Sequence, residues 1–250
     1  MKVPQYITYD NFAEVYDKYL AKNSLKVIPI LNQLSLSELP EGAKILDLCC
    51  GSGHISKKLA ELGFKVTGID SSAEMLVLAR KNASQVDFKL DDARTFNLPN
   101  MFDLVISMSD SLNHIMRKEE LDLVFKNVYN SLYDGGTFIF DLTMEEGYKR
   151  HWLDYKSNII EDSIVCAIST SYDPPDRIGK FKATIFSRND EWKRTDVTLY
   201  QRSYSRDELV SGLERAGFLD IKVYDAKQDF RLKVDGKNVF VAKKYVDWVK

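Results

Sequence analysis

The stretch Lys44-Ile45-Leu46-Asp47-Leu48-Cys49-Cys50-Gly51-Ser52-Gly53 decides the fold. Its first five residues are mostly apolar and stand between turn-forming glycines, which predicts a short buried strand. A helical pattern then follows, with Gly63 placed to end it, at Ile55, Leu59 and Leu62. A strand, a glycine-containing turn and a helix in this order predict a nucleotide-binding element. Glycines let the backbone approach a ligand, and the free N–H groups of the helix point into the site.

The residues around the two glycines indicate which nucleotide is bound. A dinucleotide-binding turn has a third glycine three residues after the second, but Ser56 stands there, which disfavours NAD. The Gly-Lys-Ser/Thr of a phosphate-binding loop is absent from this turn. Asp47 ends the strand, where a carboxylate would repel phosphates but suits a ligand with an ammonium group. S-adenosylmethionine has an amino-acid head, a ribose and an adenine, and it has no phosphate.

The pattern Asp47-x-Cys49-x-Gly51-x-Gly53 resembles the first motif of class I S-adenosylmethionine-dependent methyltransferases. Cys49 stands where the commonest pattern has glycine, at a position where small residues are frequent in that family. The alternative is a strand-turn-helix with incidental glycines. The resemblance implies S-adenosyl-L-methionine as the cofactor and contacts to it from these four residues. It also implies an α/β fold with a Rossmann-like seven-stranded sheet flanked by helices.

The second predicted strand, residues 64–69, ends at Asp70. Asp70 lies one loop, one helix and one strand beyond Asp47, where strand-end acids accept hydrogen bonds from ribose hydroxyls. Ser71 and Glu74 form a capping-box pattern, so we expect a helix to begin directly after Asp70. Met75, on the first turn of that helix, is placed to contact an adenine ring.

Further strand ends follow at regular intervals. Residues 86–90 predict a third strand, after which the resemblance implies adenine contacts from Asp92 and Ala93, with Asp91 as the alternative to Asp92. Residues 102–107 predict a buried fourth strand, followed by a cofactor contact at Met108. A helix ended by residues 134–136 and a fifth strand at 137–140 come next. Alternating strands and helices predict a mainly parallel sheet that binds ligands at the carboxyl ends of its strands.

Residues 144–204 interrupt this alternation with three stretches of apolar residues at every second position, separated by Pro-Pro-Asp and Asn-Asp turns. They predict an antiparallel β insertion after the fifth strand. We expect it either to cover the methyl acceptor or to extend the sheet with a hydrophobic face. Ser205 and Glu208 then form a second capping box, and residues 218–224 and 239–242 predict the last two strands.

Residues 1–34 are interpreted as an N-terminal helical arm. An aromatic face at three- and four-residue spacing predicts packing on the core, through Phe12, Val15, Tyr16 and Tyr19. The stretch from Tyr9 to Asp17 also resembles the N-terminal arm of small-molecule methyltransferases, which closes over the cofactor. That resemblance implies cofactor contacts from Tyr16 and Tyr9. A second helix is expected at residues 25–34, with Pro29 either kinking it or in its first turn.

The composition limits which binding partners and which cellular compartment we expect for the protein. The chain has 250 residues and a formal net charge of −2, which fits a single domain, 1–250, and gives no reason to expect a nucleic-acid partner. Three cysteines make no disulfide framework, and three histidines far apart in sequence give no metal site. No apolar run has the length of a signal peptide or a membrane span. We therefore expect a cytoplasmic protein away from membranes, as a monomer or homodimer.

The loop after the fourth strand is expected to face the acceptor. Asp110 is placed to pair with a substrate amine and His114 to act as a base, although purely structural roles fit both residues equally well. An Asn-Pro-Pro-Tyr motif is absent, which argues against methylation of nucleobase or glutamine amino groups. The arm, the insertion and this loop together resemble amino-sugar N,N-dimethyltransferases and glycine N-methyltransferase, which implies a small-molecule N or O acceptor. Two alternatives are an NAD-binding oxidoreductase and a non-catalytic S-adenosylmethionine-binding protein.

Overall fold

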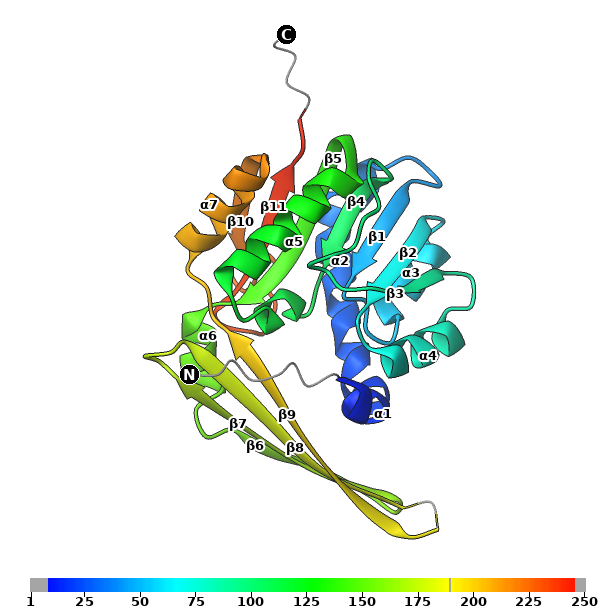
Figure 1. The fold of residues 1–250 in the computed structure, drawn as a ribbon, viewed down its shortest axis with the longest axis vertical. Coiled ribbons are helices and arrows are strands. Elements are labelled where there is room, and N and C mark those ends of the chain that lie inside the picture. Colours follow the sequence, from blue (N-terminus) through cyan, green and yellow to red (C-terminus); the bar gives the residue numbers. More distant parts are fainter. Residues whose placement is uncertain (1–8, 189, 246–250) are drawn as a thin grey trace.

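The structure is a computed structural model that describes residues 9–188 and 190–245. These residues form a seven-stranded sheet and a separate four-stranded sheet (Figure 1). Residues 1–8 of the expected arm, residue 189 of the Asn-Asp turn and residues 246–250 lie outside the described ranges. Within those ranges, no helix combines the length and the apolar character needed to cross a membrane.

The larger sheet has the order β10-β11-β5-β4-β1-β2-β3, in which the first five strands of the chain run parallel and β11 runs antiparallel to β5. Its strands are β1 Lys44–Leu48, β2 Lys65–Asp70, β3 Asp87–Leu90, β4 Phe102–Ser107, β5 Leu132–Thr143, β10 Leu219–Asp225 and β11 Lys237–Lys243. The predicted seven-stranded α/β sheet is therefore confirmed.

Helices cover both faces of this sheet. One face carries α2 Ile28–Leu34, α3 His54–Glu61 and α4 Ala73–Asn82, and the other carries α5 Lys118–Ser131 and α7 Arg206–Ala216 (Figure 1). Each helix buries an apolar stripe against the sheet, which gives one hydrophobic cluster on each side. Pro29 lies in the first turn of α2, where its missing N–H has no intrahelical partner to lose.

Two local predictions in this sheet were wrong. The cap of α4 is Ser72 and not Ser71, because Ser72 has an extended backbone and its Oγ accepts a hydrogen bond from Met75 N at 3.2 Å. The strand β5 begins at Leu132, so residues 134–136 lie within it and do not end α5. The second capping box is confirmed, since Ser205 and Glu208 bond reciprocally at the start of α7.

The insertion after β5 consists of α6 Glu145–His151 and an antiparallel sheet in the order β6-β7-β8-β9. Its strands are β6 Lys156–Glu161, β7 Ile164–Asp173, β8 Ile178–Arg188 and β9 Trp192–Arg202. The three strands with alternating apolar residues are confirmed. The sequence did not predict α6 or β6, because β6 is a mostly exposed edge strand that has no buried face to impose an alternation.

The aromatic face of the arm packs on the insertion sheet, whereas Val27, farther along the arm, joins the main core. It runs through short helical segments, η1 Tyr9–Phe12, α1 Ala13–Val15, η2 Tyr16–Leu20 and η3 Ala21–Val27. Phe12 and Val15 are 2% and 3% exposed and join one cluster with the inner face of the insertion sheet: Cys166, Ile168, Ala183, Ile185, Val197 and Leu199. In Figure 1 the arm lies between this sheet and α4. The predicted aromatic face exists, but it packs on the insertion sheet and not, as had been expected, on the core of the main sheet.

Gly68, in the middle of β2, gives a test of the packing between β2 and β3. A Cβ at this position would lie 2.5 Å from the ring of buried Phe88. We expect Gly68→Ala to lower the free energy of unfolding by about 1–3 kcal/mol, the range typical of overpacking. Urea denaturation measures this loss. In the matched double variant, Gly68→Ala with Phe88→Leu, the combined loss should be smaller than the sum of the two single losses. Additive losses would contradict the role assigned to this contact.

Candidate active site

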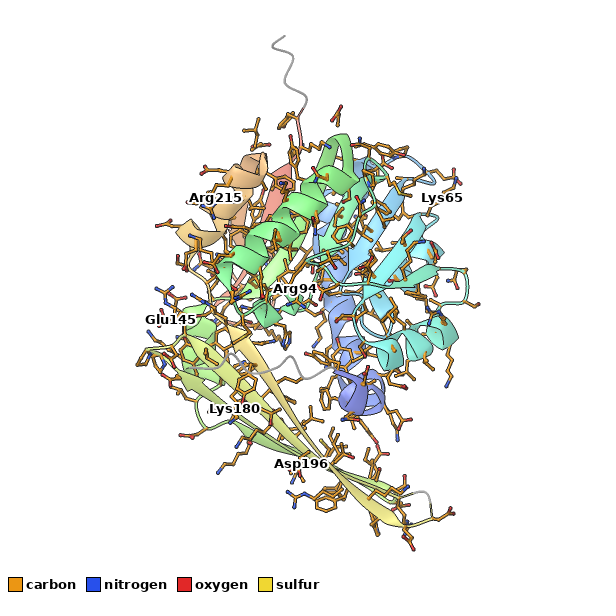
Figure 2. The ribbon with its side chains drawn as sticks, viewed as in Figure 1. Lys65, Arg94, Glu145, Lys180, Asp196 and Arg215 are labelled. Carbon is orange, nitrogen blue, oxygen red and sulfur yellow. The ribbon has the colours of Figure 1, made fainter. Side chains whose placement is uncertain are left out.

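Three cavities meet beneath the arm at the carboxyl ends of β1, β2 and β4. The inner cavity, about 170 Å³, lies at the ends of β2 and β3, and a narrow cleft beside it reaches Asp47. The outer cavity, about 590 Å³, lies between the arm, the loop after β4 and residues 231–237. Tyr16 and Ser109 line all three spaces. Arg94, which lines the inner cavity, marks the position of this site in Figure 2, between the two sheets.

The glycine loop forms one wall of the inner cavity. Cys49 and Gly51 line it, and both have positive φ angles, 62° and 54°. Gly53 lines none of these three spaces; its φ is 78°, and a Cβ there would lie 2.8 Å from the ring of Phe88. The first glycine therefore brings backbone close to the cavity, and the second allows the loop to pack on β3 and α4.

Asp70 fixes the position of this loop. Its Oδ2 accepts a hydrogen bond from Gly51 N at 2.8 Å, and its Oδ1 accepts one from Ser72 N at 2.9 Å. The carboxylate thus joins the glycine loop to the start of α4, and it lines the inner cavity. Burial raises the pKa of Asp70 above its ordinary value, although the two backbone donors oppose that shift.

Asp47 is the buried acid of the narrow cleft. Its side chain is held by Ser56 Oγ, which donates to Asp47 Oδ2. Asp47 is 2% exposed, and this burial raises its pKa to about 7. Ser56, the residue that departs from the dinucleotide pattern, is therefore the residue that orients this carboxylate.

The far wall of the inner cavity is formed by residues that follow β2 and β3. Ser71, Met75, Asp91, Asp92 and Ala93 all line it, together with Arg94. Arg94 donates to both oxygens of Asp92, and these bonds hold the pKa of that carboxyl below its usual range. Both alternatives for the adenine contact, Asp91 and Asp92, thus line the cavity. Arg94 was missed by sequence reasoning, and its position directly after Asp92 and Ala93 is the signal that could have identified it.

The arm closes the inner cavity with two tyrosines. Tyr9 OH bonds with His114 Nε2 at 2.8 Å, and burial raises the pKa of Tyr9 well above its ordinary value and that of Tyr16 to about 12. His114 Nδ1 donates to the Tyr200 carbonyl at 2.9 Å, so Nε2 is the acceptor of the ring. Burial lowers the pKa of His114 to about 4, so the ring is neutral at pH 7.

Asp110 belongs to the outer cavity, whereas His114 lines the inner one. Asp110 Oδ2 accepts from Lys237 Nζ at 2.9 Å and its Oδ1 accepts from Thr143 Oγ1 at 2.8 Å. Asp141 lies beside it, accepting from Asp110 N at 2.8 Å and from Lys237 Nζ at 3.3 Å. The sequence did not single out Lys237 or Asp141 as site residues. Asp141 carried a weak signal, because it follows an apolar strand, while Lys237 carried none.

Most predicted site residues lie together. Of the cofactor candidates, all but Gly53 line the inner cavity or the narrow cleft: Tyr9, Tyr16, Asp47, Cys49, Gly51, Asp70, Ser71, Met75, Asp92, Ala93 and Met108. The donors and acceptors fit S-adenosylmethionine, since a buried carboxylate faces the cleft and a second carboxylate lies beside the inner cavity. Among the described residues, no group of three or more His, Cys, Asp or Glu side chains is arranged to hold a metal ion.

Comparison with known proteins identifies the family. Residues 45–136 match a family model described as a methyltransferase domain. YqeM of Bacillus subtilis, whose name gives it as a methyltransferase without an acceptor, is 32% identical over 84% of this chain and 86% of its own length. A glycine/sarcosine N-methyltransferase from Aphanothece halophytica is 36% identical over 43% of this chain and 45% of its own length.

The fold agrees with a solved structure. The crystal structure of an S-adenosylmethionine-dependent methyltransferase from Clostridium acetobutylicum matches 95% of this chain and 99% of its own, with a TM-score of 0.79 and 24% identity. Together with the similarity to YqeM over most of both chains, this sets aside the dinucleotide-binding alternative. The chain therefore belongs to the class I methyltransferases and uses S-adenosylmethionine as its cofactor.

Proposed function

We propose that the chain transfers a methyl group to a nitrogen or oxygen atom of a small molecule bound in the outer cavity. The observation that carries this proposal is that Tyr16 and Ser109 line the inner cavity, the narrow cleft and the outer cavity alike. A cofactor extending from the inner cavity into the cleft would have its sulfonium near these two residues. The outer cavity opens at the same two residues, which suits an acceptor.

The cofactor is proposed to lie with its adenosine in the inner cavity and its amino-acid end in the cleft. Asp70 and the residues after β3 would then hold the ribose and the adenine, and Asp47 would pair with the ammonium group. The bound cofactor supplies an electrophilic methyl carbon on sulfur. The chain's own residues orient the two reactants and exclude water, which Tyr9 and Tyr16 do by covering the cavity.

The outer cavity supports a small acceptor. Its inner end carries Asp110, Asp141 and Lys237, which are mutually paired, and its sides carry Trp152, Leu232 and Val234. Such a mixture of apolar walls with a few polar groups is typical of small-molecule sites. The similarity to a protein named for methylation of glycine and sarcosine supports the same class of acceptor.

Asp110 is proposed to orient the acceptor. The hypothesis that His114 accepts a proton stays a prediction, and three observations bear on it. His114 does not line the outer cavity, and its acceptor nitrogen already receives hydrogen bonds from Tyr9 OH and Gln201 Nε2. A histidine with a pKa of about 4 is also a weak base at neutral pH.

A metabolite screen tests the proposed function directly. Purified protein is incubated with S-adenosylmethionine and pools of amines, hydroxylated aromatics and amino sugars, and release of S-adenosylhomocysteine is measured. Turnover with one small molecule, with S-adenosylmethionine consumed in equal amount, is the expected result. Turnover with protein or nucleic acid and with none of the small molecules would contradict it.

Asp70→Ala is expected to weaken binding of S-adenosylmethionine and S-adenosylhomocysteine by roughly ten- to hundredfold. The physical reason is the loss of hydrogen bonding to a charged acceptor, which costs about 1.5–3 kcal/mol in total. Calorimetry measures the affinity. Asp87→Ala is the matched control, because Asp87 is an exposed acid on β3 that lines none of the three spaces. Unchanged affinity in a folded Asp70→Ala protein would refute the ribose assignment.

The pKa of Asp47 predicts a pH dependence for cofactor binding. Pairing with an ammonium group requires the ionised carboxylate, and in the free protein Asp47 is largely protonated below its pKa of about 7. The affinity for S-adenosylhomocysteine should therefore rise by up to about tenfold per pH unit from pH 5 to pH 7 and then level off. Methylthioadenosine, which lacks the ammonium group, is the control ligand and should show no such slope. Equal slopes for both ligands would contradict the pairing.

Asp110→Asn and His114→Asn separate the two acceptor hypotheses. We expect Asp110→Asn to raise the KM for the acceptor at least tenfold, because a charged hydrogen-bond acceptor is lost, while His114→Asn changes kcat by less than tenfold. Steady-state kinetics with the acceptor from the screen measures both. A loss of about 10²–10⁴ in kcat for His114→Asn, with cofactor affinity unchanged, would instead establish His114 as the base.

A further inference from the structure

We propose that Lys237 is the positioning residue of the acceptor site: its ammonium group holds the Asp110 and Asp141 carboxylates side by side and thereby fixes the turn at Ser109 and Asp110. This inference rests on the proposed function, which assigns the outer cavity to the acceptor. It concerns a residue that lies 127 positions beyond Asp110 in the chain and that contacts it only through the folding of β11 beside β5.

Lys237 is built into the sheet and does not reach in from the surface. It opens β11 opposite Thr143 of β5, and its side chain is only 13% exposed. The ammonium group lies 2.9 Å from Asp110 Oδ2 and 3.3 Å from Asp141 Oδ2. Burial lowers the pKa of Lys237, but the two carboxylates raise it by more, so the residue is a permanent cation.

The turn that Lys237 supports is a strained one. Ser109 and Asp110 both have positive φ angles, 65° and 60°, although neither is glycine. Three hydrogen bonds hold Asp110 in this conformation: its N donates to Asp141 Oδ1, its carbonyl accepts from Asn113 N, and its Oδ1 accepts from Thr143 Oγ1. A strained turn persists only where its surroundings determine it. The bond from Asp110 N is strongest when Asp141 is ionised, which places a second carboxylate charge next to that of Asp110.

Charge explains why a cation is needed there. Asp141 is 1% exposed, and burial raises its pKa while Lys237 lowers it. Four other titratable groups interact electrostatically with Asp110: Tyr9, Tyr16 and Tyr148, whose pKa values are raised, and His114, whose pKa is lowered. All four are neutral at pH 7. The outer cavity is also lined by His151, Arg231, Lys233 and Asp235. Lys237 is the described cation that forms ion pairs with both carboxylates, at 2.9 Å and 3.3 Å, and it thereby reduces the charge of the cluster from −2 to −1.

Three variants of the full-length protein, each in complex with S-adenosylhomocysteine, test the proposal. Lys237→Met removes the charge at similar length, Lys237→Arg keeps it, and Lys243→Met makes the same change at the other end of β11 as a control. The aspartate carboxyl carbons are labelled with ¹³C and titrated from pH 4 to pH 9 by NMR.

In Lys237→Met, we expect one more aspartate carboxyl group to take up a proton above pH 6 than in Lys237→Arg or Lys243→Met. With the acceptor, we expect at least a tenfold rise in KM, an acid limb of the kcat/KM profile that moves to higher pH, and restoration by Lys237→Arg. An unchanged titration and an unchanged acid limb in folded Lys237→Met would overturn the proposal.

A second variant covers failure of Lys237→Met to fold. The double variant Lys237→Met with Asp141→Asn returns the cluster to a charge of −1, and we expect it to fold with an acceptor KM within about threefold of the parent. If the folded double variant instead had an acceptor KM at least tenfold above that of the parent, the proposal that Lys237 compensates the carboxylate charge would be overturned. Binding of S-adenosylhomocysteine by Lys243→Met is the separate measure of the proposed function, and its absence would refute that function and not the role of Lys237.

Discussion

The structure depends on one carboxylate, that of Asp70. It accepts from the backbone of Gly51 and of Ser72, and so it joins the glycine loop of β1 to the start of α4. The cap Ser72 then donates its hydroxyl to Asp10 of the arm, which also accepts from Glu74 N. The arm is fixed to the cofactor elements by this chain of hydrogen bonds, and the insertion sheet packs in turn on the arm. A single strand-end acid thus connects the main sheet, the glycine loop, the arm and the insertion sheet.

The site contains three acids that are largely withdrawn from solvent, since Asp47 and Asp141 are buried and Asp70 is half-buried. Desolvation raises the pKa of each, and each is held by a different kind of partner: a serine hydroxyl, two backbone N–H groups and a lysine. A buried carboxylate costs free energy unless it is paired. Two of these acids face the inner cavity and the cleft, where a ligand with hydrogen-bond donors would stabilise them further.

Sequence reasoning succeeded for most local signals, although it misplaced the cap of α4 and the end of α5. The strand-turn-helix around Gly51, the strand-end acids and the capping box at Ser205 are properties of short stretches, and the structure has them where they were predicted. It failed where the role of a residue depends on a partner that is distant in the sequence. The face of Phe12 was recognised but not its partner sheet, and Lys237 acquires its role only because β11 pairs with β5. Ser56 was taken only as a departure from another motif, because its bond to Asp47 cannot be read from spacing.

The arm has a consequence for the order of events in solution. Its Phe12 is part of the hydrophobic cluster of the insertion sheet, while Tyr16, four residues later, lines the cofactor spaces and the outer cavity together. A ligand that enters either space therefore acts on the same short segment. Linkage then requires reciprocity. If an acceptor bound in the outer cavity changes the affinity for the cofactor by some factor, the bound cofactor changes the affinity for the acceptor by the same factor. Tyr16, which lines all three spaces, is a residue of the arm that both binding steps share.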